Sequence, residues 1–376
     1  MAALTLVKYV KEYGDYTFME RPMNDVDSLV LCQLSYLKFD GMVPGLNENR
    51  ASVSMSQIAA HERYENLYAD ERYEKENRAL FEAMASSKRY GKMKMNCFIN
   101  IIEEQWETQF AAITYLLEDG TIYVCYRGTD ENLIGWKEDF NMAFLSPIPG
   151  QGYSVKYLNI VTDRFPNDFY VGGHSKGGNL AIYASMECLN EVKERIIKIY
   201  CMDGPGFRPE TLEKSEYASI ADRVVKILPH SSLVGMIFQT DTNYKVVESR
   251  NLGLMQHDPY SWLIKDGEFV TVDEIHKGRK LSNDTLNEWV LKQEQETLKV
   301  FGETLFQVLY ASGADNLIDL GKDWKKSLNG VLKALKEVDP ETKKMVKLAV
   351  KEFLELGARR LLGKAKTEEE TEDGQE

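Results

Sequence analysis

A glycine-rich string in the middle of the chain constrains the fold more than any other feature. Residues 168–184 have the sequence DFYVGGHSKGGNLAIYA, in which an apolar run passes through glycines into a helical pattern. Within it, Gly173-His-Ser-Lys-Gly177 fits the G-x-S-x-G pattern, in which a serine lies on a tight turn between a strand and a helix. Glycines are needed on both sides, because side chains there would collide with the neighbouring strand and helix. The string therefore predicts a strand, a sharp turn that carries Ser175, and a helix.

The segments before this string predict strands that pair with one another. Residues 94–102, 108–117 and 121–127 are rich in Ile, Val, Phe, Tyr and Thr, and an Asp-Gly turn signal separates the last two segments. We expect them to be the leading antiparallel strands of a sheet. Ahead of them, residues 25–37 have apolar positions at helical spacing, and residues 55–88 predict two helices.

Helical and strand patterns alternate from about residue 153 onward. The expected helices are 153–165, 176–190 and 210–221, and the expected strands are 168–173, 196–202 and 223–228. Strands separated by helices of this length form βαβ units in a mostly parallel sheet. The order predicts an α/β fold, doubly wound, with helices on both faces of the sheet.

The end of the chain has a different pattern. We predict a main domain at 1–280, which includes the N-terminal helical segment, a helical extension at 281–366, and an acidic disordered tail at 367–376. Residues 341–366 of the extension are amphipathic, with eight basic and three acidic residues. They can pack on their own domain, lie on an anionic membrane surface or pair with a partner helix.

Composition excludes several classes of function. The chain has 376 residues, 43% of them hydrophobic, which is enough for a substantial core. Its net charge of -13 argues against a general nucleic-acid binder, because neutralising phosphates requires clustered Lys and Arg. The five cysteines are widely spaced in mostly apolar runs, as unpaired core thiols are. Without a signal sequence, a transmembrane run or a metal motif, we expect a cytoplasmic protein with no cofactor and no metal.

A nucleophilic serine needs a base, and the base needs an orienting acid. His230, His257 and His276 lie downstream of the glycine-rich string. We expect His257 to be the base, because it lies in a loop-like string with aromatic residues close by. His230, which follows the predicted strand 223–228, is the alternative.

The acid has two candidates. Asp203 follows the predicted strand 196–202, so its carboxylate projects from the carboxyl edge of the sheet, where Ser175 also lies. Asp203 also opens a D-G-P-G string, so a turn-forming role is an equal interpretation. Asp241 is the alternative acid. For the oxyanion hole we expect the backbone N–H groups of Lys176 and Thr129, the residue that ends a Tyr-Arg-Gly-Thr string.

These motifs resemble those of the class 3 lipase branch of the α/β hydrolases. The YRGT string at 126–129, followed by Trp136 and Asp139, is similar to the FRGT...W..D element of that family. The string at 173–181, GHSKGGNLA, is similar to its GHSLGGALA. The resemblance implies an α/β-hydrolase fold with a mostly parallel central sheet, leading antiparallel strands and helices on both faces.

A closer resemblance is to an uncharacterised bacterial family of lipase-like hydrolases. It is carried by residues 26–36, 203–207 and 256–259, and the similarity as a whole covers roughly residues 15–265. Class 3 lipases carry their acid just after the strand that corresponds to 223–228, and this chain has no carboxylate there. Asp203 resembles the strand-end Asp of the pancreatic lipases, so the resemblance favours it.

Lys176 is a second departure from the family pattern, because an apolar residue usually follows the serine. Its ammonium group either favours an anionic substrate or points to solvent, and we expect the latter. Taken together, the sequence predicts a serine hydrolase of esterase or lipase type that cleaves a small-molecule or lipid ester through an acyl-enzyme. The alternative is a catalytically degenerate α/β-hydrolase-like binding or scaffold protein.

Overall fold

The computed structural model describes residues 4–275 and a few isolated positions beyond them. The gaps within that range are 70–72, 104, 106–107, 131–132, 143–146, 233, 240–242 and 252. The chain forms two compact units, one made of Met1–Thr129 and Pro147–Leu291, the other of Asp130–Ser146 and Lys292–Glu376. Of the second unit, the structure describes helix α6 (Leu133–Asn141) and isolated residues. The amphipathic segment 341–366 lies outside the described residues except for Lys344, so its membrane or partner role stays a prediction.

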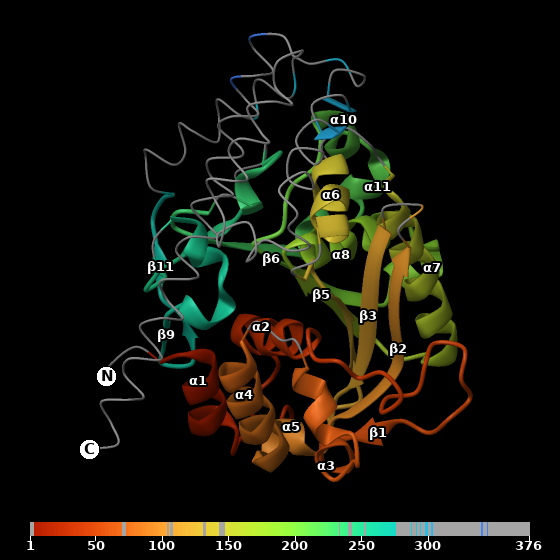
Figure 1. Cartoon of the computed structure of the whole chain (residues 1–376), viewed down its shortest axis with the longest axis vertical. Coiled ribbons are helices and arrows are strands. Elements are labelled where there is room, and N and C mark those ends of the chain that lie inside the picture. The colour runs from red at the N-terminus through yellow and green to blue at the C-terminus, as the bar shows by residue number, and fades with distance from the viewer. Residues whose placement is uncertain are drawn as a thin grey trace, which may run out of the picture. The chain divides into compact units, whose positions relative to one another are not determined.

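The first unit is built on a mixed sheet (Figure 1). Its strands, in their order across the sheet, are β1 (Val53–Ser54), β2 (Lys94–Glu103), β3 (Thr108–Leu116), β4 (Ile122–Tyr126), β5 (Phe169–His174), β6 (Ile196–Met202), β7 (Val224–Pro229), β8 (Lys245–Val247) and β11 (Thr271–Val272). Strands β9 (Ile264–Lys265) and β10 (Glu268–Phe269) form a separate pair.

Helices pack on both sides of this sheet. The α-helices of the first unit are α1 (Leu6–Tyr13), α2 (Asp25–Leu34), α3 (Met55–Ala59), α4 (Glu74–Ser86), α5 (Lys88–Gly91), α7 (Pro149–Arg164), α8 (Lys176–Glu187), α9 (Asn190–Lys193), α10 (Pro209–Leu212) and α11 (Ser215–Ala218). The 3-10 helices are η1 (Tyr64–Tyr68), η3 (Ala221–Arg223), η4 (Val234–Met236), η5 (Gly253–His257) and η6 (Pro259–Ser261).

Strand pairing confirms the predicted mixture of directions. Strands β1 to β4 pair antiparallel in succession, β4 to β8 pair parallel, and β11 closes the edge antiparallel to β8. The parallel strands follow one another in chain order. Right-handed crossovers between such strands place their helices on a single face. The predicted doubly wound order is therefore wrong in this detail, although both faces carry helices as expected.

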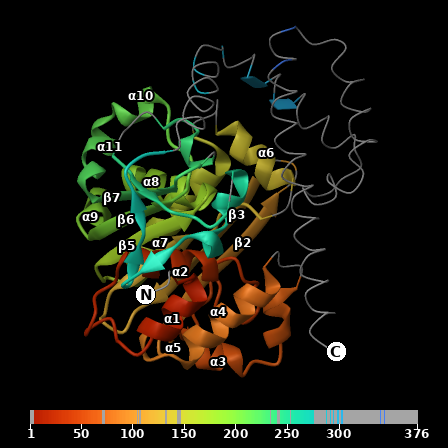
Figure 2. The ribbon, with the colours of Figure 1, turned by 90° about the vertical axis from the view of Figure 1, so that its left-hand side faces the viewer.

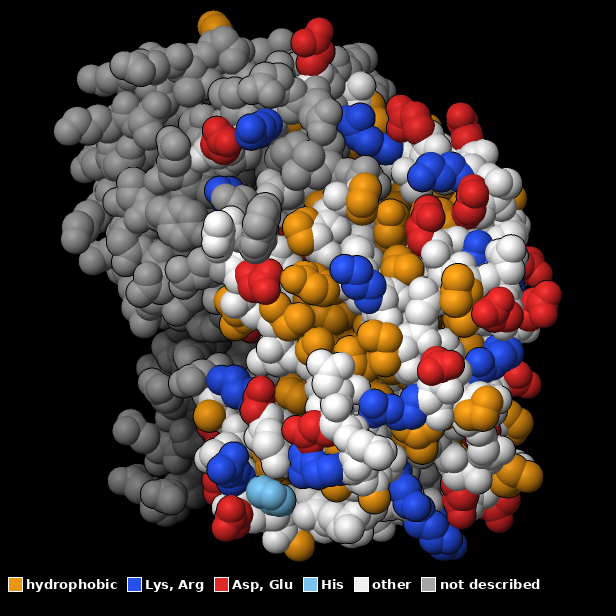
Figure 3. Space-filling view, turned by 90° about the vertical axis from the view of Figure 1, so that its right-hand side faces the viewer, with side chains coloured by type: hydrophobic (Ala, Val, Ile, Leu, Met, Phe, Trp, Pro, Cys, Tyr) orange, Lys and Arg blue, Asp and Glu red, His pale blue; other side chains and the backbone are white. Residues whose placement is uncertain are grey.

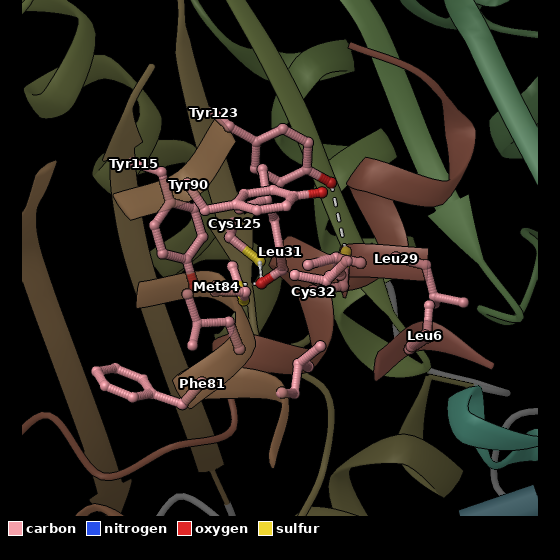
Figure 4. Packing of buried hydrophobic residues seen from close by; sticks show 14 of the residues in the cluster. Leu6, Leu29, Leu31, Cys32, Phe81, Met84, Tyr90, Tyr115, Tyr123 and Cys125 are labelled. Carbon is pink, nitrogen blue, oxygen red and sulfur yellow. Dashed lines mark hydrogen bonds between the residues drawn. The ribbon is translucent and has the colours of Figure 1, made fainter. Parts of the chain in front are cut away.

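The two helical layers have different origins. Crossover helices α7 and α8 cover one face, whereas the N-terminal helices α1, α2 and α4 cover the other (Figure 1 and Figure 2). Strand β4 shows the division, since Val124 and Tyr126 pack in the crossover-helix core and Tyr123 and Cys125 pack in the N-terminal core. In the N-terminal core the hydroxyl of Tyr123 lies 3.3 Å from the Cys32 sulfur of α2 (Figure 4).

Two helical predictions are wrong in their continuity. Residues 210–221 form α10, α11 and the start of η3, with an extended Lys214 between α10 and α11. Residues 55–88 form α3, η1, α4 and the start of α5 where two helices were expected.

On the surface, hydrophobic side chains gather on the face shown in Figure 3, among interspersed acidic and basic groups. Ile102, Ile160 and Leu189 are among the large hydrophobic residues that are exposed. Within the described part of the chain, no helix is both long enough and apolar enough to cross a bilayer. The five cysteines are all buried and unpaired, and burial raises the pKa of the Cys188 thiol to about 11.

A buried ion pair fastens the N-terminal layer together. The side chains of Asp27 (α2) and Arg89 (α5) are completely buried, and Arg89 Nη2 lies 2.5 Å from Asp27 Oδ2. The carboxylate also accepts hydrogen bonds from the hydroxyls of Tyr9 and Tyr90, at 3.0 Å and 2.5 Å. Burial, followed by the charge of Asp27, raises the pKa of both tyrosines. Helices α1, α2 and α5 thus converge on one carboxylate.

We expect Arg89→Met to lower the free energy of unfolding by about 3–5 kcal/mol, because it leaves the Asp27 carboxylate buried without its cation. Urea unfolding of the full chain measures this. The double variant Arg89→Met with Asp27→Leu should lose less than the single variant, since no charge then remains unpaired. Lys92→Ala, which removes an exposed pair with Glu118, is the control and should change stability by less than about 1 kcal/mol. Equal losses for Arg89→Met and Lys92→Ala would contradict the assignment.

Candidate active site

Ser175 occupies the sharp turn between β5 and α8 that the sequence predicts. Its backbone has φ 58° and ψ -132°, a conformation that an L-residue adopts only under strain. The N–H of Ser175 donates to the Met202 oxygen of β6 at 2.9 Å, and its own oxygen accepts from Gly178 N–H at 2.9 Å. These bonds hold the strained residue in place, with 5% of its surface exposed.

Close backbone contacts explain the glycines around the serine. A Cβ on Gly177 would overlap the main-chain oxygen of Tyr126 at the end of β4, and a Cβ on Gly173 would overlap the main chain of Gly177. Helix α8 can therefore start directly against two strands only because both positions are glycine. This packing fixes the position of the turn that carries Ser175 at the end of β5.

Asp203 and His257 form a hydrogen-bonded pair at the same edge of the sheet. Asp203 follows β6 with a positive φ of 48°, and its side chain is 1% exposed. Its Oδ2 lies 2.6 Å from Nδ1 of His257, a side chain that is 19% exposed. Because a carboxylate accepts, Nδ1 carries the proton, and Nε2 of the neutral imidazole keeps its lone pair. This is the tautomer that a general base needs.

His174, the residue before Ser175, brings His257 beside the turn. The two imidazole rings lie 4.5 Å apart between centroids, with an angle of 33° between their planes. Nε2 of His174 lies 3.0 Å from the main-chain oxygen of His257, and Nδ1 lies 3.1 Å from the Tyr36 hydroxyl. A carbonyl oxygen only accepts, so His174 donates from Nε2, and Nδ1 of that tautomer can accept from the Tyr36 hydroxyl. His257 is thus tied to the element that carries Ser175.

The loop after β4 approaches the serine from the other side. A Cβ on Gly128 would meet the Tyr36 hydroxyl, the main-chain oxygen of His174 and, at 3.0 Å, the Cβ of Ser175. Thr129 follows directly, and Lys176 begins α8 next to Ser175. The predicted oxyanion donors therefore belong to two segments that meet at the serine.

The comparisons with known proteins agree with this architecture. The model of the Mbeg1-like family, a lipase-like family, matches residues 84–307, which is more than half of the chain. The chain belongs to the Mbeg1-like family. It is a lipase-like α/β-hydrolase, as the sequence resemblance implied.

A solved lipase structure resembles the chain weakly. The crystal structure of M37 lipase matches with a TM-score of 0.35 and 13% identity, over 58% of this chain and 70% of the lipase chain. Similarity at this level does not bear on activity. No curated protein sequence matches the chain significantly.

The side chain of Lys176 in this Mbeg1-like protein does not point to solvent, so that prediction is wrong. Lys176 is 1% exposed, and its Nζ donates to the main-chain oxygen of Gln109 in β3 at 2.8 Å. The side chain extends from the start of α8 to β3, where the main-chain carbonyl of Gln109 accepts the hydrogen bond. The ammonium group thus supports the packing of α8 on β3.

The alternative residues have other surroundings. Nε2 of His230 accepts a hydrogen bond from the side-chain amide of Gln256 at 2.8 Å, so among the described residues its partner is an amide and not a carboxylate. Asp241 and His276 lie outside the described residues. Of the predicted candidates, the structure joins Asp203 to His257 and sets the His257 ring against His174, the residue before Ser175. The segments that carry Thr129 and Lys176 adjoin Ser175.

Sequence reasoning missed three residues that support the pair. Ser232 donates to Asp203 Oδ1 at 2.5 Å, Tyr36 bonds to His174, and Gln256 holds the loop before His257. The only signal for Ser232 was its place after the strand where class 3 lipases carry their acid. Tyr36 ended the segment 26–36 that resembled the family, but nothing in the sequence placed its hydroxyl near a histidine.

The Cys201 thiol near the turn is unreactive. Cys201 of β6 lies beneath the serine turn, since a Cβ on Gly178 would meet its sulfur at 2.8 Å. Burial raises the pKa of this thiol, which keeps it protonated and poorly nucleophilic. Across the described positions, no three His, Cys, Asp or Glu side chains are arranged to hold a metal ion.

We expect Lys176→Leu to lower the free energy of unfolding by about 1–3 kcal/mol, because the buried Gln109 oxygen loses its charged donor. Denaturant titration of the full chain measures the change. Lys198→Leu, at an exposed position of β6, is the matched control and should shift stability by less than about 0.5 kcal/mol. A Lys176→Leu protein as stable as the parent would argue against a structural role for the ammonium group.

Proposed function

We propose that this lipase-like protein is a serine hydrolase that cleaves a carboxylic ester through an acyl-enzyme. The observation that carries the proposal is the hydrogen bond between Asp203 and His257, set beside a serine in a strained strand-to-helix turn. Each of the three residues follows a different strand, and all three lie at one edge of the sheet. This combination supports acyl transfer better than a binding function, which needs neither the strain nor the tautomer.

In the proposed reaction, Ser175 Oγ attacks the ester carbonyl while Nε2 of His257 takes the hydroxyl proton. Asp203 holds the imidazole by Nδ1 and stabilises the imidazolium that forms. The backbone N–H groups of Thr129 and Lys176 stabilise the oxyanion of the tetrahedral intermediate. His257 then returns its proton to the leaving alcohol, and water releases the acyl group by the same steps in reverse order.

The substrate class within this proposal is a small-molecule or lipid ester. The Lys176 ammonium is buried and bonded to the Gln109 oxygen, so it does not support the alternative of an anionic substrate. A cytoplasmic location stays a prediction from the sequence.

We expect Ser175→Ala to abolish labelling by a fluorophosphonate probe and to reduce hydrolysis of p-nitrophenyl esters by about 10⁴-fold or more. Asp203→Asn should reduce it by about 10⁴-fold, because the amide favours the wrong tautomer of His257. Mass spectrometry of the labelled peptide identifies the residue.

Ser185→Ala is the matched control, since Ser185 is a completely buried serine of α8 whose hydroxyl bonds to Ala181 within the helix. It should be labelled like the parent. Labelling that persists in Ser175→Ala would reject the nucleophile. A folded parent that neither reacts with the probe nor cleaves any ester would favour the degenerate binding or scaffold protein.

A further inference from the structure

The acid of the proposed triad is held by a residue from the neighbouring strand. Strands β6 and β7 are adjacent and parallel, so the residues that follow them emerge at the same edge of the sheet. Asp203 follows β6 and Ser232 follows β7, and Ser232 Oγ lies 2.5 Å from Asp203 Oδ1. Both residues are buried, with 0% and 2% of their surfaces exposed. The contact is therefore shielded from water.

The direction of this hydrogen bond is fixed by a third group. The N–H of Gly235 donates to Ser232 Oγ at 3.0 Å, so the hydroxyl accepts there and donates to the carboxylate. The same N–H lies 3.2 Å from Asp203 Oδ1. A side chain at 235 would overlap both Asp203 Oδ1 and Leu228, so a glycine is needed for this approach. One oxygen of Asp203 is thus held by two donors, and the other oxygen faces His257.

The loop that contains Ser232 also contacts the loop that carries the base. The N–H of Ser231 donates to Gln256 Oε1 at 2.7 Å, and the amide of Gln256 donates to the Asn251 oxygen at 2.8 Å. Gln256 directly precedes His257. The segment after β7 therefore touches the acid through a side chain and the loop of the base through its backbone.

We propose that Ser232 is a positioning residue for the Asp203–His257 pair, an inference that rests on the proposed function. It keeps the carboxylate in the rotamer that presents Oδ2 to His257, and it disperses the charge on Oδ1. A hydrogen bond from a hydroxyl to a buried carboxylate is one of the stronger kinds in proteins, so its loss affects the partner directly.

The test is the rate of fluorophosphonate labelling of the full chain as a function of pH, which requires no knowledge of the substrate. Ser232→Ala should react about tenfold more slowly at its optimum, because the carboxylate is no longer fixed. The acidic limb of its profile should move to higher pH, because a carboxylate with one donor fewer stabilises the imidazolium more strongly. Ser232→Thr keeps the hydroxyl and should restore most of the rate and the parental profile.

Ser154→Ala is the matched control, because Ser154 is a buried serine of α7 whose hydroxyl bonds to the Gln151 oxygen at 2.7 Å. It should label like the parent. A second readout is the low-field proton resonance of the His257 Nδ1–H, which should shift in Ser232→Ala and stay unchanged in Ser154→Ala.

The outcomes separate this proposal from the one on which it rests. If Ser175→Ala is not labelled but Ser232→Ala keeps the parental rate, profile and proton resonance, the positioning role is overturned and the hydrolase stands. The positioning role is also overturned if Ser232→Ala is labelled more slowly at every pH with no shift of the acidic limb. It is likewise overturned if Ser232→Thr has the same labelling rate and pH profile as Ser232→Ala. A parent that is not labelled at Ser175 overturns the proposed function itself.

Discussion

The fold requires helices on both faces of its sheet, although the parallel strands follow one another in chain order. Right-handed crossovers place the connecting helices α7 and α8 on one face, and these two helices leave the opposite face uncovered. That face carries large buried side chains, among them Tyr115, Tyr123 and Tyr200, whose exposure would be costly. The N-terminal helices supply the cover, and the buried contact between Asp27 and Arg89 holds them in one layer.

A second constraint is the distance between α8 and the strands beneath it. The helix begins so close to β4 and β5 that Gly177 lies against the Tyr126 carbonyl, and this leaves Ser175 in a strained conformation. Asp203 is strained as well, with a positive φ at the end of the next strand. Strain of this kind persists only where surrounding contacts determine the backbone. Here the N–H of Ser175 donates to the Met202 oxygen and the N–H of Asp203 donates to the Ile227 oxygen. These hydrogen bonds between adjacent strand ends hold both residues in place.

Much of the fold was accessible from the sequence, because strand and helix periodicities are local properties. The strands β2 to β7 and the helix after Ser175 lie where the patterns predicted them. The motifs also placed Asp203 at the carboxyl edge of the sheet and selected His257 among the histidines, and the structure joins these two side chains. What the sequence missed depends on long-range geometry. The direction of the Lys176 side chain was set by an acceptor on β3, and the contact of Ser232 required two strand ends to be adjacent.

The position of Tyr36 has a consequence for the size of the functional unit. This residue lies between the covering helices and the serine turn, where its hydroxyl reaches both His174 and the loop at Gly128. The region that defines the family begins at residue 84 and does not include it. A fragment cut to the matched residues would lose α1, α2, α3 and most of α4, together with the Tyr36 hydroxyl that contacts His174. The part of the chain that makes the contacts around the serine turn is therefore larger than the part that the family model matches.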